Sequence, residues 1–137
     1  MIDFENQIFN VIALALRNEN PTITITGEEL TVTASDSTFP VVTVIQKSNT
    51  TMESMIDNIS IENFSNVMFE VDVYTNLVSG KKAQAKSIMD IIDNNFQTLG
   101  FVRNFYQPLS NLADTTIYRL KARYKAVIGK DGRVYTS

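Results

Sequence analysis

Two pairs of carboxylates are the residues of this sequence whose type and spacing could support chemistry. Asp90 and Asp93 lie three positions apart in a predicted helix, and Glu28 and Glu29 are adjacent in a predicted turn. Neighbouring carboxylates can exchange protons with a substrate or hold Mg²⁺. The apolar stripe of the helix leaves Asp90 and Asp93 as ordinary residues of its outer face, so we expect no metal site there.

One glycine-lysine motif could bind an anion. Ser79-Gly80-Lys81-Lys82 precedes the same helix, whose first backbone N–H groups can face a negative charge. Nucleotide-binding loops follow longer patterns, G-x-G-x-x-G or G-x-x-x-x-G-K-[ST], and the sequence contains neither. Phosphate binding at this motif is therefore a minor alternative, and we expect no cofactor.

The chain contains no Cys, His or Trp. These absences exclude a disulfide framework, a thiolate or imidazole metal site, a Cys or His nucleophile and a Ser-His-Asp triad within one chain. Asp, Glu, Lys, Tyr and Ser could still serve an enzyme, but no constellation of them points to one. We expect no catalytic residue and a protein that is not an enzyme.

The composition is typical of one soluble globular domain spanning residues 1–137, with 44% hydrophobic and 20% charged residues. The net charge of −3 lacks the basic excess of nucleic-acid-binding proteins. No window of 18 apolar residues predicts a membrane span. The start carries Asp3 and Glu5 rather than Lys or Arg, unlike a secretory signal peptide, so we expect an intracellular protein.

Helical spacing of apolar residues predicts two helices. The first covers residues 3–17 with Asp3 as the N-cap, and the second covers residues 80–99 with Gly100 just past its end. The expected core stripe of the first helix is Phe4, Ile8, Val11, Ile12 and Ala15, widened by Phe9, Leu14 and Leu16. That of the second is Ala85, Ile88, Met89, Ile92, Phe96 and Leu99.

Alternating residues predict the strands. A hairpin is expected over residues 22–33, and a strand over 39–47 is apolar on both faces, as in a central strand. Further strands are expected over 66–75 and 116–128, followed by a tight turn and a short return strand over 133–136. The fold class predicted is α+β, with a mixed, mainly antiparallel sheet of about four to five strands and two principal helices packed on one face.

Two segments have no clear pattern. Residues 48–64 are polar and predicted to be irregular, and we expect them to order on assembly. Residues 101–111 are also predicted to be irregular, because Pro108 would break a regular element.

Two predicted strands carry charge on one face only. Glu70 and Asp72 alternate with apolar residues in the first, and Arg119, Lys121, Arg123 and Lys125 do so in the second. If these strands are neighbours, cross-strand ion pairs follow, each contributing roughly 0.2–1 kcal/mol. Four cations against two carboxylates leave a positive surplus. A partner surface, a neighbouring subunit or a passing polyanion could use it, and a solvated sheet face is the alternative.

Three lysines open the second helix, where the helix dipole disfavours cations. A solvated helix face is the favoured interpretation of these lysines, and a contact with an outside partner is the alternative. The candidate subunit or partner interface is therefore Glu70, Asp72, Lys81, Lys82, Lys86, Arg119, Lys121, Arg123 and Lys125.

A succession of motifs from Phe69 to Tyr135 resembles a known family. The strand Phe69-Glu-Val-Asp-Val-Tyr-Thr-Asn is followed by a Gly80-Lys-Lys helix start and an Ile-Met-Asp-Ile-Ile-Asp93 helix. Leu99-Gly-Phe101, Gln107-Pro-Leu and a strand with Tyr118-Arg-Leu-Lys-Ala-Arg-Tyr124 complete the series. It resembles the tail-terminator or tail-completion proteins of long-tailed, non-contractile phages, often described as minor capsid proteins.

The resemblance implies a structural role in the virion. Such proteins have a mixed sheet with helices packed against it, and they form a ring, commonly hexameric, on the last ring of the tail tube. The ring ends tail elongation and provides the surface for head–tail joining. The expected partners are other copies of the chain, tail-tube protein and head–tail connector proteins, with genomic DNA passing transiently through the lumen. The expected location is the virion tail or neck, and the host cytoplasm during assembly.

The basic row would retain DNA if it lined that lumen. We therefore expect Arg119, Lys121, Arg123 and Lys125 mostly to pair with acids within or between subunits. Two other readings remain open. One is a head-side neck protein, a connector or stopper of the same virion, and the other is a monomeric ligand-binding module.

Overall fold

The computed structural model describes residues 4–21, 23–28, 39–51, 64–77, 79–109, 116–129 and 134–135. Two helices and six strands lie within these ranges. In chain order they are α1 (Glu5–Glu19), β1 (Thr24–Thr26), β2 (Val41–Thr51), β3 (Phe64–Thr75), α2 (Lys81–Thr98), β4 (Val102–Leu109), β5 (Tyr118–Gly129) and β6 (Val134–Tyr135).

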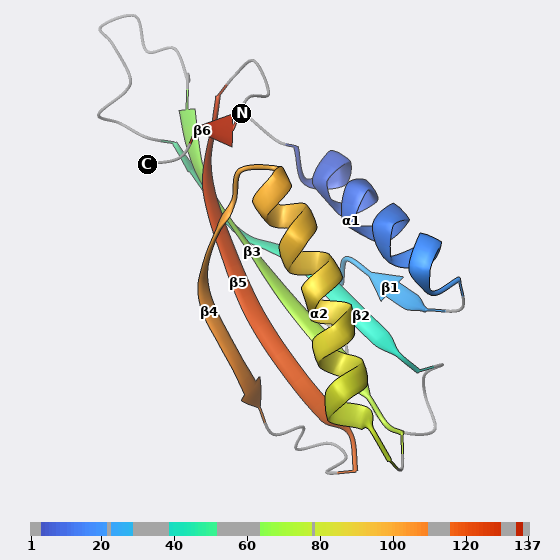
Figure 1. The fold of residues 1–137 in the computed structure, drawn as a ribbon. Helices are drawn as coiled ribbons and strands as arrows, with labels where there is room; N and C mark the ends of the chain where they lie inside the picture. Colours follow the sequence, from blue (N-terminus) through green and yellow to red (C-terminus); the bar gives the residue numbers. More distant parts are fainter. Residues whose placement is uncertain are drawn as a thin grey trace, which may run out of the picture.

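The strands form one mixed, mostly antiparallel sheet in the order β1-β2-β3-β5-β4, and β6 pairs with β5 beside this path. Only β1 and β2 run parallel. Both helices lie on the same face of the sheet (Figure 1). This arrangement confirms the predicted α+β class, with its antiparallel bias and its two helices on one face.

The core fills the space between the helices and the inner face of the sheet, which we define as the face that they cover. The ring of Phe96 stacks on that of Tyr124 with centroids 4.3 Å apart, and Phe101 meets Phe96 edge-on at 5.1 Å. Aromatic pairs of this kind add about 0.5–1.5 kcal/mol beyond the apolar area that they bury. The other inner-face side chains include Val42, Val44, Val67, Phe69, Val71, Val73, Leu120 and Ala122.

The end of α2 has the geometry that the sequence predicts. Gly100 has a φ of 93°, its N–H donates to the carbonyl of Gln97, and the Phe101 N–H donates to the carbonyl of Phe96. This pair of hydrogen bonds, with the contact between Phe96 and Phe101, is a Schellman motif. It turns the chain directly from α2 into β4.

The first helix is shifted from its predicted bounds, and its core stripe is narrower. It runs over Glu5–Glu19 with Phe4 at the N-cap position, and Asp3 lies outside the described residues. Ile8, Ile12, Ala13 and Leu16 are buried, whereas Val11 and Leu14 are 41% and 63% exposed. The prediction that Val11 and Leu14 belong to the core was wrong, because α1 presents only its i, i+4 stripe to α2 and the sheet.

The prediction that Pro108 breaks any element in 101–111 was also wrong. Residues 102–109 form β4, which pairs with β5 and places Pro108 opposite Leu120. An edge strand tolerates proline because only one side of its backbone is hydrogen-bonded to a neighbour. The register shifts between Arg103 and Phe105, which further interrupts the alternation expected of a strand.

The prediction that residues 48–64 are irregular was wrong at both ends of this range. Strand β2 continues to Thr51 after a register shift between Gln46 and Ser48, and β3 begins at Phe64. Residues 52–63 lie outside the described part of the chain, as do residues 30–33 of the predicted hairpin and 130–133 of the predicted turn. The return strand is confirmed, since β6 pairs antiparallel with β5.

Candidate subunit interface on the outer sheet face

The acidic and basic rows meet on the outer face of the sheet, the face opposite the helices. Strands β3 and β5 are antiparallel neighbours, and their register places Glu70 opposite Arg123, Asp72 opposite Lys121 and Tyr74 opposite Arg119. The inner-face partners alternate with them, because successive side chains of a strand point to opposite faces. The two strands are therefore neighbours, which is the condition for the predicted cross-strand ion pairs.

Three cations of β5 bind the two carboxylates of β3. Arg119 Nε donates to Asp72 Oδ1 at 2.9 Å, and Arg123 Nε donates to Glu70 Oε2 at the same distance. Lys121 Nζ donates to Glu70 Oε1 at 2.8 Å and lies 3.8 Å from Asp72 Oδ2. The cluster is a continuous ion network within one chain. It accounts for three members of the basic row without a second subunit.

A fourth cation enters the network from β2. Lys47 lies at the register shift of β2, and its Nζ is 4.0 Å from Glu70 Oε1. Thr43 and Ile45 lie opposite Asp72 and Glu70, so the alternation of β2 already places Lys47 on the outer face. Sequence reasoning missed its ion pair because the pairing of β2 with β3 was not predicted. Glu70 therefore faces three cations, Lys47, Lys121 and Arg123.

Burial strengthens these ion pairs. Glu70, Asp72 and Lys121 are only 8%, 4% and 9% exposed, although they lie on the face without helices. Burial alone would raise the pKa of Glu70, but hydrogen bonds from Lys121 and Arg123 and the nearby charges outweigh it and leave that pKa lowered. Burial likewise acts to lower the pKa of Arg119, and its bond to Asp72 reverses this into a rise.

Aromatic rings hold the two arginines in place. The Arg123 guanidinium lies 4.7 Å from the ring centroid of Phe105, and that of Arg119 lies 5.5 Å from the ring centroid of Tyr74. Each guanidinium is therefore fixed by a carboxylate and by an aromatic face. Phe105 was missed as a site residue because β4 was predicted to be irregular.

The remaining candidate residues lie apart from the network. Lys125 is exposed and makes no ion pair with a described residue. Lys81 Nζ donates to the carbonyl of Thr116 at 3.1 Å, which anchors the start of α2 to the chain before β5. Lys82 and Lys86 are exposed on α2. The structure thus brings five of the nine candidates into contact and leaves four outside that network.

Asp93 is not the ordinary outer-face residue that the helix pattern predicts. Its carboxylate accepts hydrogen bonds from the Tyr124 hydroxyl at 3.0 Å, from Gln97 at 2.7 Å and from Arg103 at 3.3 Å. Asp93 flanks the buried stripe of α2 and so reaches the inner face of β5. Burial and the charge of Asp93 raise the pKa of Tyr124, which stays a neutral donor. Asp90 is exposed, as predicted.

Comparisons with known proteins add no further assignment, since no family model and no curated protein matches the chain. Within the described ranges, no group of three or more acidic or other metal-binding side chains could hold a metal ion. No helix in those ranges is long and apolar enough to cross a membrane.

Proposed function

We propose that this chain is a structural phage assembly protein that caps the tail tube as a ring, ends tail elongation and offers a surface for head–tail joining. The proposal rests on the resemblance to tail-terminator proteins. One observation carries it furthest: the motifs of that resemblance fall on consecutive, mutually packed elements. They cover β3, α2, β4 and β5, the unit that contains the ion network and the aromatic core.

Each motif has a defined place in this unit. The Gly80-Lys81-Lys82 motif starts α2, with Gly80 at a φ of 90°, and Leu99-Gly100-Phe101 forms the Schellman turn into β4. The Tyr-Arg strand supplies both the ion network and Tyr124. These elements follow one another in the order that the resemblance implies. This agreement in element order is the support that the fold lends to the proposal.

The two faces of the sheet also suit an assembly protein. Both helices cover the inner face, so the described elements leave the outer face without a covering layer (Figure 1). Exposed parts of Arg123 and Lys125 lie on this face. Ring subunits need such surfaces, because each copy must contact a neighbour on both sides.

The deciding experiment is co-assembly with purified tail-tube protein. We expect the chain to bind only the ends of tubes, to stop their elongation, and to be visible there as rings in negative-stain images. Light scattering of a free hexamer of 15.4 kDa subunits would give about 92 kDa. Binding to purified portal instead of tube ends would favour the connector or stopper reading. Binding to neither partner would contradict a role in the phage neck.

A further inference from the structure

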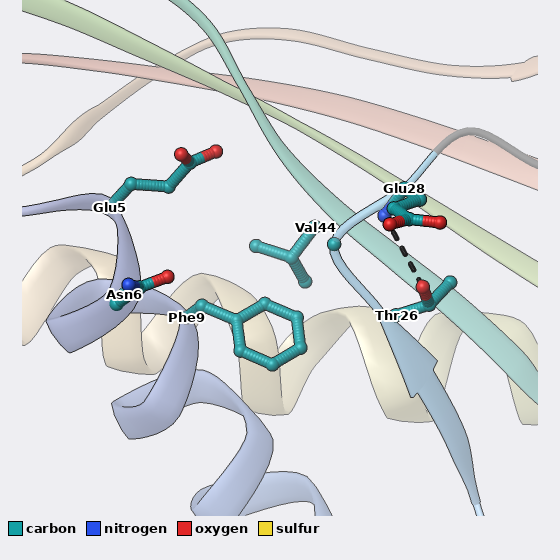
Figure 2. Close-up of a pocket in the computed structure, with 7 residues that line it drawn as sticks. Glu5, Asn6, Phe9, Thr26, Glu28 and Val44 are labelled. Carbon is teal, nitrogen blue, oxygen red and sulfur yellow. Dashed lines mark hydrogen bonds between the residues drawn. The ribbon is translucent and has the colours of Figure 1, made fainter.

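A groove on the opposite edge of the molecule from β4 has the chemistry to hold a positively charged side chain. It lies between the first turns of α1 and the end of β1, and its volume is about 310 Å³. Glu5 and Glu28 stand on its two sides, with the ring of Phe9 and the side chain of Val44 between them (Figure 2). Asn6, Thr26 and Gly27 complete the lining.

The walls of the groove are held by hydrogen bonds. The Gln46 N–H donates to Glu5 Oε2 at 3.4 Å, and the Glu28 N–H donates to the Thr26 hydroxyl at 3.2 Å. The base is closed by Phe9, whose ring carbons lie 3.7 Å from the position that a Cβ of Gly27 would take. Two carboxylates on either side of an aromatic ring suit a guanidinium or ammonium group, which gains from both kinds of contact.

Charge is distributed unequally across the strand order. Strands β4 and β5 carry five cations and no carboxylate, and three carboxylates from β3 and α2 bind them, which leaves a surplus of two positive charges. At the other edge, α1 and the described residues directly after β1 carry three carboxylates, Glu5, Glu19 and Glu28, and one cation, Arg17. The described residues there have a surplus of two negative charges.

We propose that the groove of one copy binds a cationic side chain of β5 from a second copy of this chain. Lys125 is the first choice, because it is exposed and makes no ion pair with a described residue. Arg123 is the second, because Nε is its only nitrogen with a hydrogen-bond partner among the described residues.

The position of the two surfaces determines the kind of assembly. Strand β1 is first and β4 is last in the strand order, so the groove and the basic strands lie on opposite sides of the molecule (Figure 1). One copy therefore cannot fill its own groove. The contact between copies is head-to-tail, and repetition closes a ring or extends a filament. The expectation that the ring closes rests on the proposed function. The inference adds which residues of two neighbouring copies are in contact.

Charge reversal at two exposed residues tests the contact. Lys125→Glu removes the cation, and Glu28→Lys places a cation in the groove. Sedimentation velocity of the full chain at about 0.05 M salt, where a Debye length exceeds 10 Å, should show each variant associating at least tenfold more weakly than the parent chain. A mixture of the two variants, and the double variant in one chain, should both recover association, since either arrangement again opposes unlike charges.

Two controls separate this contact from a change in net charge. Asp90→Lys makes the same charge change as Glu28→Lys, and Asn94→Glu adds a negative charge as Lys125→Glu does, both at exposed positions of α2 outside the candidate interface. Both should associate like the parent chain. Association of the two test variants at the parent level would overturn the inference. So would equal weakening in the controls, failure of the double variant to recover, or a parent chain that stays monomeric up to about 1 mM at low salt. Capping of tail tubes by the parent chain is measured in a separate experiment. If the chain caps tubes but the variants associate normally, the proposed function stands and only the contact between groove and Lys125 is refuted. If the chain does not cap tubes, the proposed function itself fails.

Discussion

Tyr124 of β5 donates a hydrogen bond of 3.0 Å to the Asp93 carboxylate of α2, across the helix–sheet interface. The Tyr124 ring is fully buried and stacks on Phe96, so its hydroxyl has no access to water as an alternative partner. Asp93 in turn contacts Arg103 of β4. One carboxylate therefore joins three elements that meet around the end of α2.

Substitution of Tyr124 by phenylalanine should destabilise the chain. Tyr124→Phe keeps the ring stacked on Phe96 but removes the donor to a charged carboxylate, which should lower the free energy of unfolding by about 1.5–3 kcal/mol. Urea denaturation followed by circular dichroism measures this difference. Tyr118→Phe is the matched control, since Tyr118 is half-buried and only flanks the core, and it should change stability much less. Equal losses in the two variants would contradict the assigned role of the Asp93 bond.

The sequence allowed us to predict which charged residues of β3 and β5 lie on the outer face, but not that the Asp93 carboxylate reaches Tyr124. In a strand the side-chain period is two, so a single misplacement would move every residue to the wrong face, and the regular alternation of β3 and β5 leaves one choice. In a helix the boundary of the buried stripe is gradual. Asp93 sits next to Ile92 at that boundary, and only the position of β5 decides whether its carboxylate reaches Tyr124.

The features that the sequence-based predictions missed depend on how the elements are arranged in space, which a single sequence does not display. The proline in β4 is acceptable only because β4 is an edge strand, and strand order is a property of the whole sheet. Lys47 follows Thr43 and Ile45 on one face of β2, and it meets Glu70 because β2 pairs with β3, a neighbour relationship that the sequence does not display. The groove of Figure 2 joins α1 to β1, two segments about 20 positions apart whose contact depends on the core.

The ion network predicts a loss of stability when Glu70 is neutralised. Glu70→Gln keeps the shape of the side chain but leaves Lys47, Lys121 and Arg123 without their shared counter-charge. We expect the free energy of unfolding at neutral pH to fall by about 1–3 kcal/mol. The control is Glu28→Gln at an exposed position, which should be nearly neutral. Chemical denaturation of both variants at pH 7 provides the comparison, and a fully stable Glu70→Gln chain would refute the importance of the network.

The same residue should make stability depend on pH in the acid range. The pKa of Glu70 in the folded chain is below its ordinary value of 4.5, so the folded state favours the ionised carboxylate. The stability gained is fully present above pH 4.5 and is lost as the pH falls through the lowered pKa. Urea midpoints from pH 7 down to pH 3 should therefore decline more steeply for the parent chain than for Glu70→Gln. Parallel curves would assign the acid sensitivity to other carboxylates.

Gly100 should resist replacement because of its backbone conformation. At a φ of 93° a residue with a Cβ is strained, and Gly100→Ala should lower the free energy of unfolding by about 1–2 kcal/mol. Gly27→Ala is the matched control, since a Cβ there would meet its neighbours at an ordinary 3.7 Å. Thermal unfolding of the two variants makes the comparison. A Gly100→Ala chain as stable as the control would show that the Schellman turn adapts without strain.

Reversal of Arg123 should damage the fold as well as any assembly. Because Arg123 bonds Glu70 and lies over Phe105, Arg123→Glu would put a carboxylate beside Glu70 and lose the ring contact. The Arg123 side chain is 38% exposed, so solvent screens part of the effect, and we expect a loss of about 1–2 kcal/mol in unfolding free energy. Lys125→Glu, two residues further along the same face, should leave stability within about 0.5 kcal/mol of the parent chain.

Light scattering of Arg123→Glu and Lys125→Glu then separates the effect on stability from the effect on assembly. Weakened assembly with normal stability, as expected for Lys125→Glu, reports on the contact between copies, whereas weakened assembly of Arg123→Glu also reflects the damaged sheet. If Arg123→Glu unfolds like the parent chain and assembles normally, the network on the outer face contributes to neither.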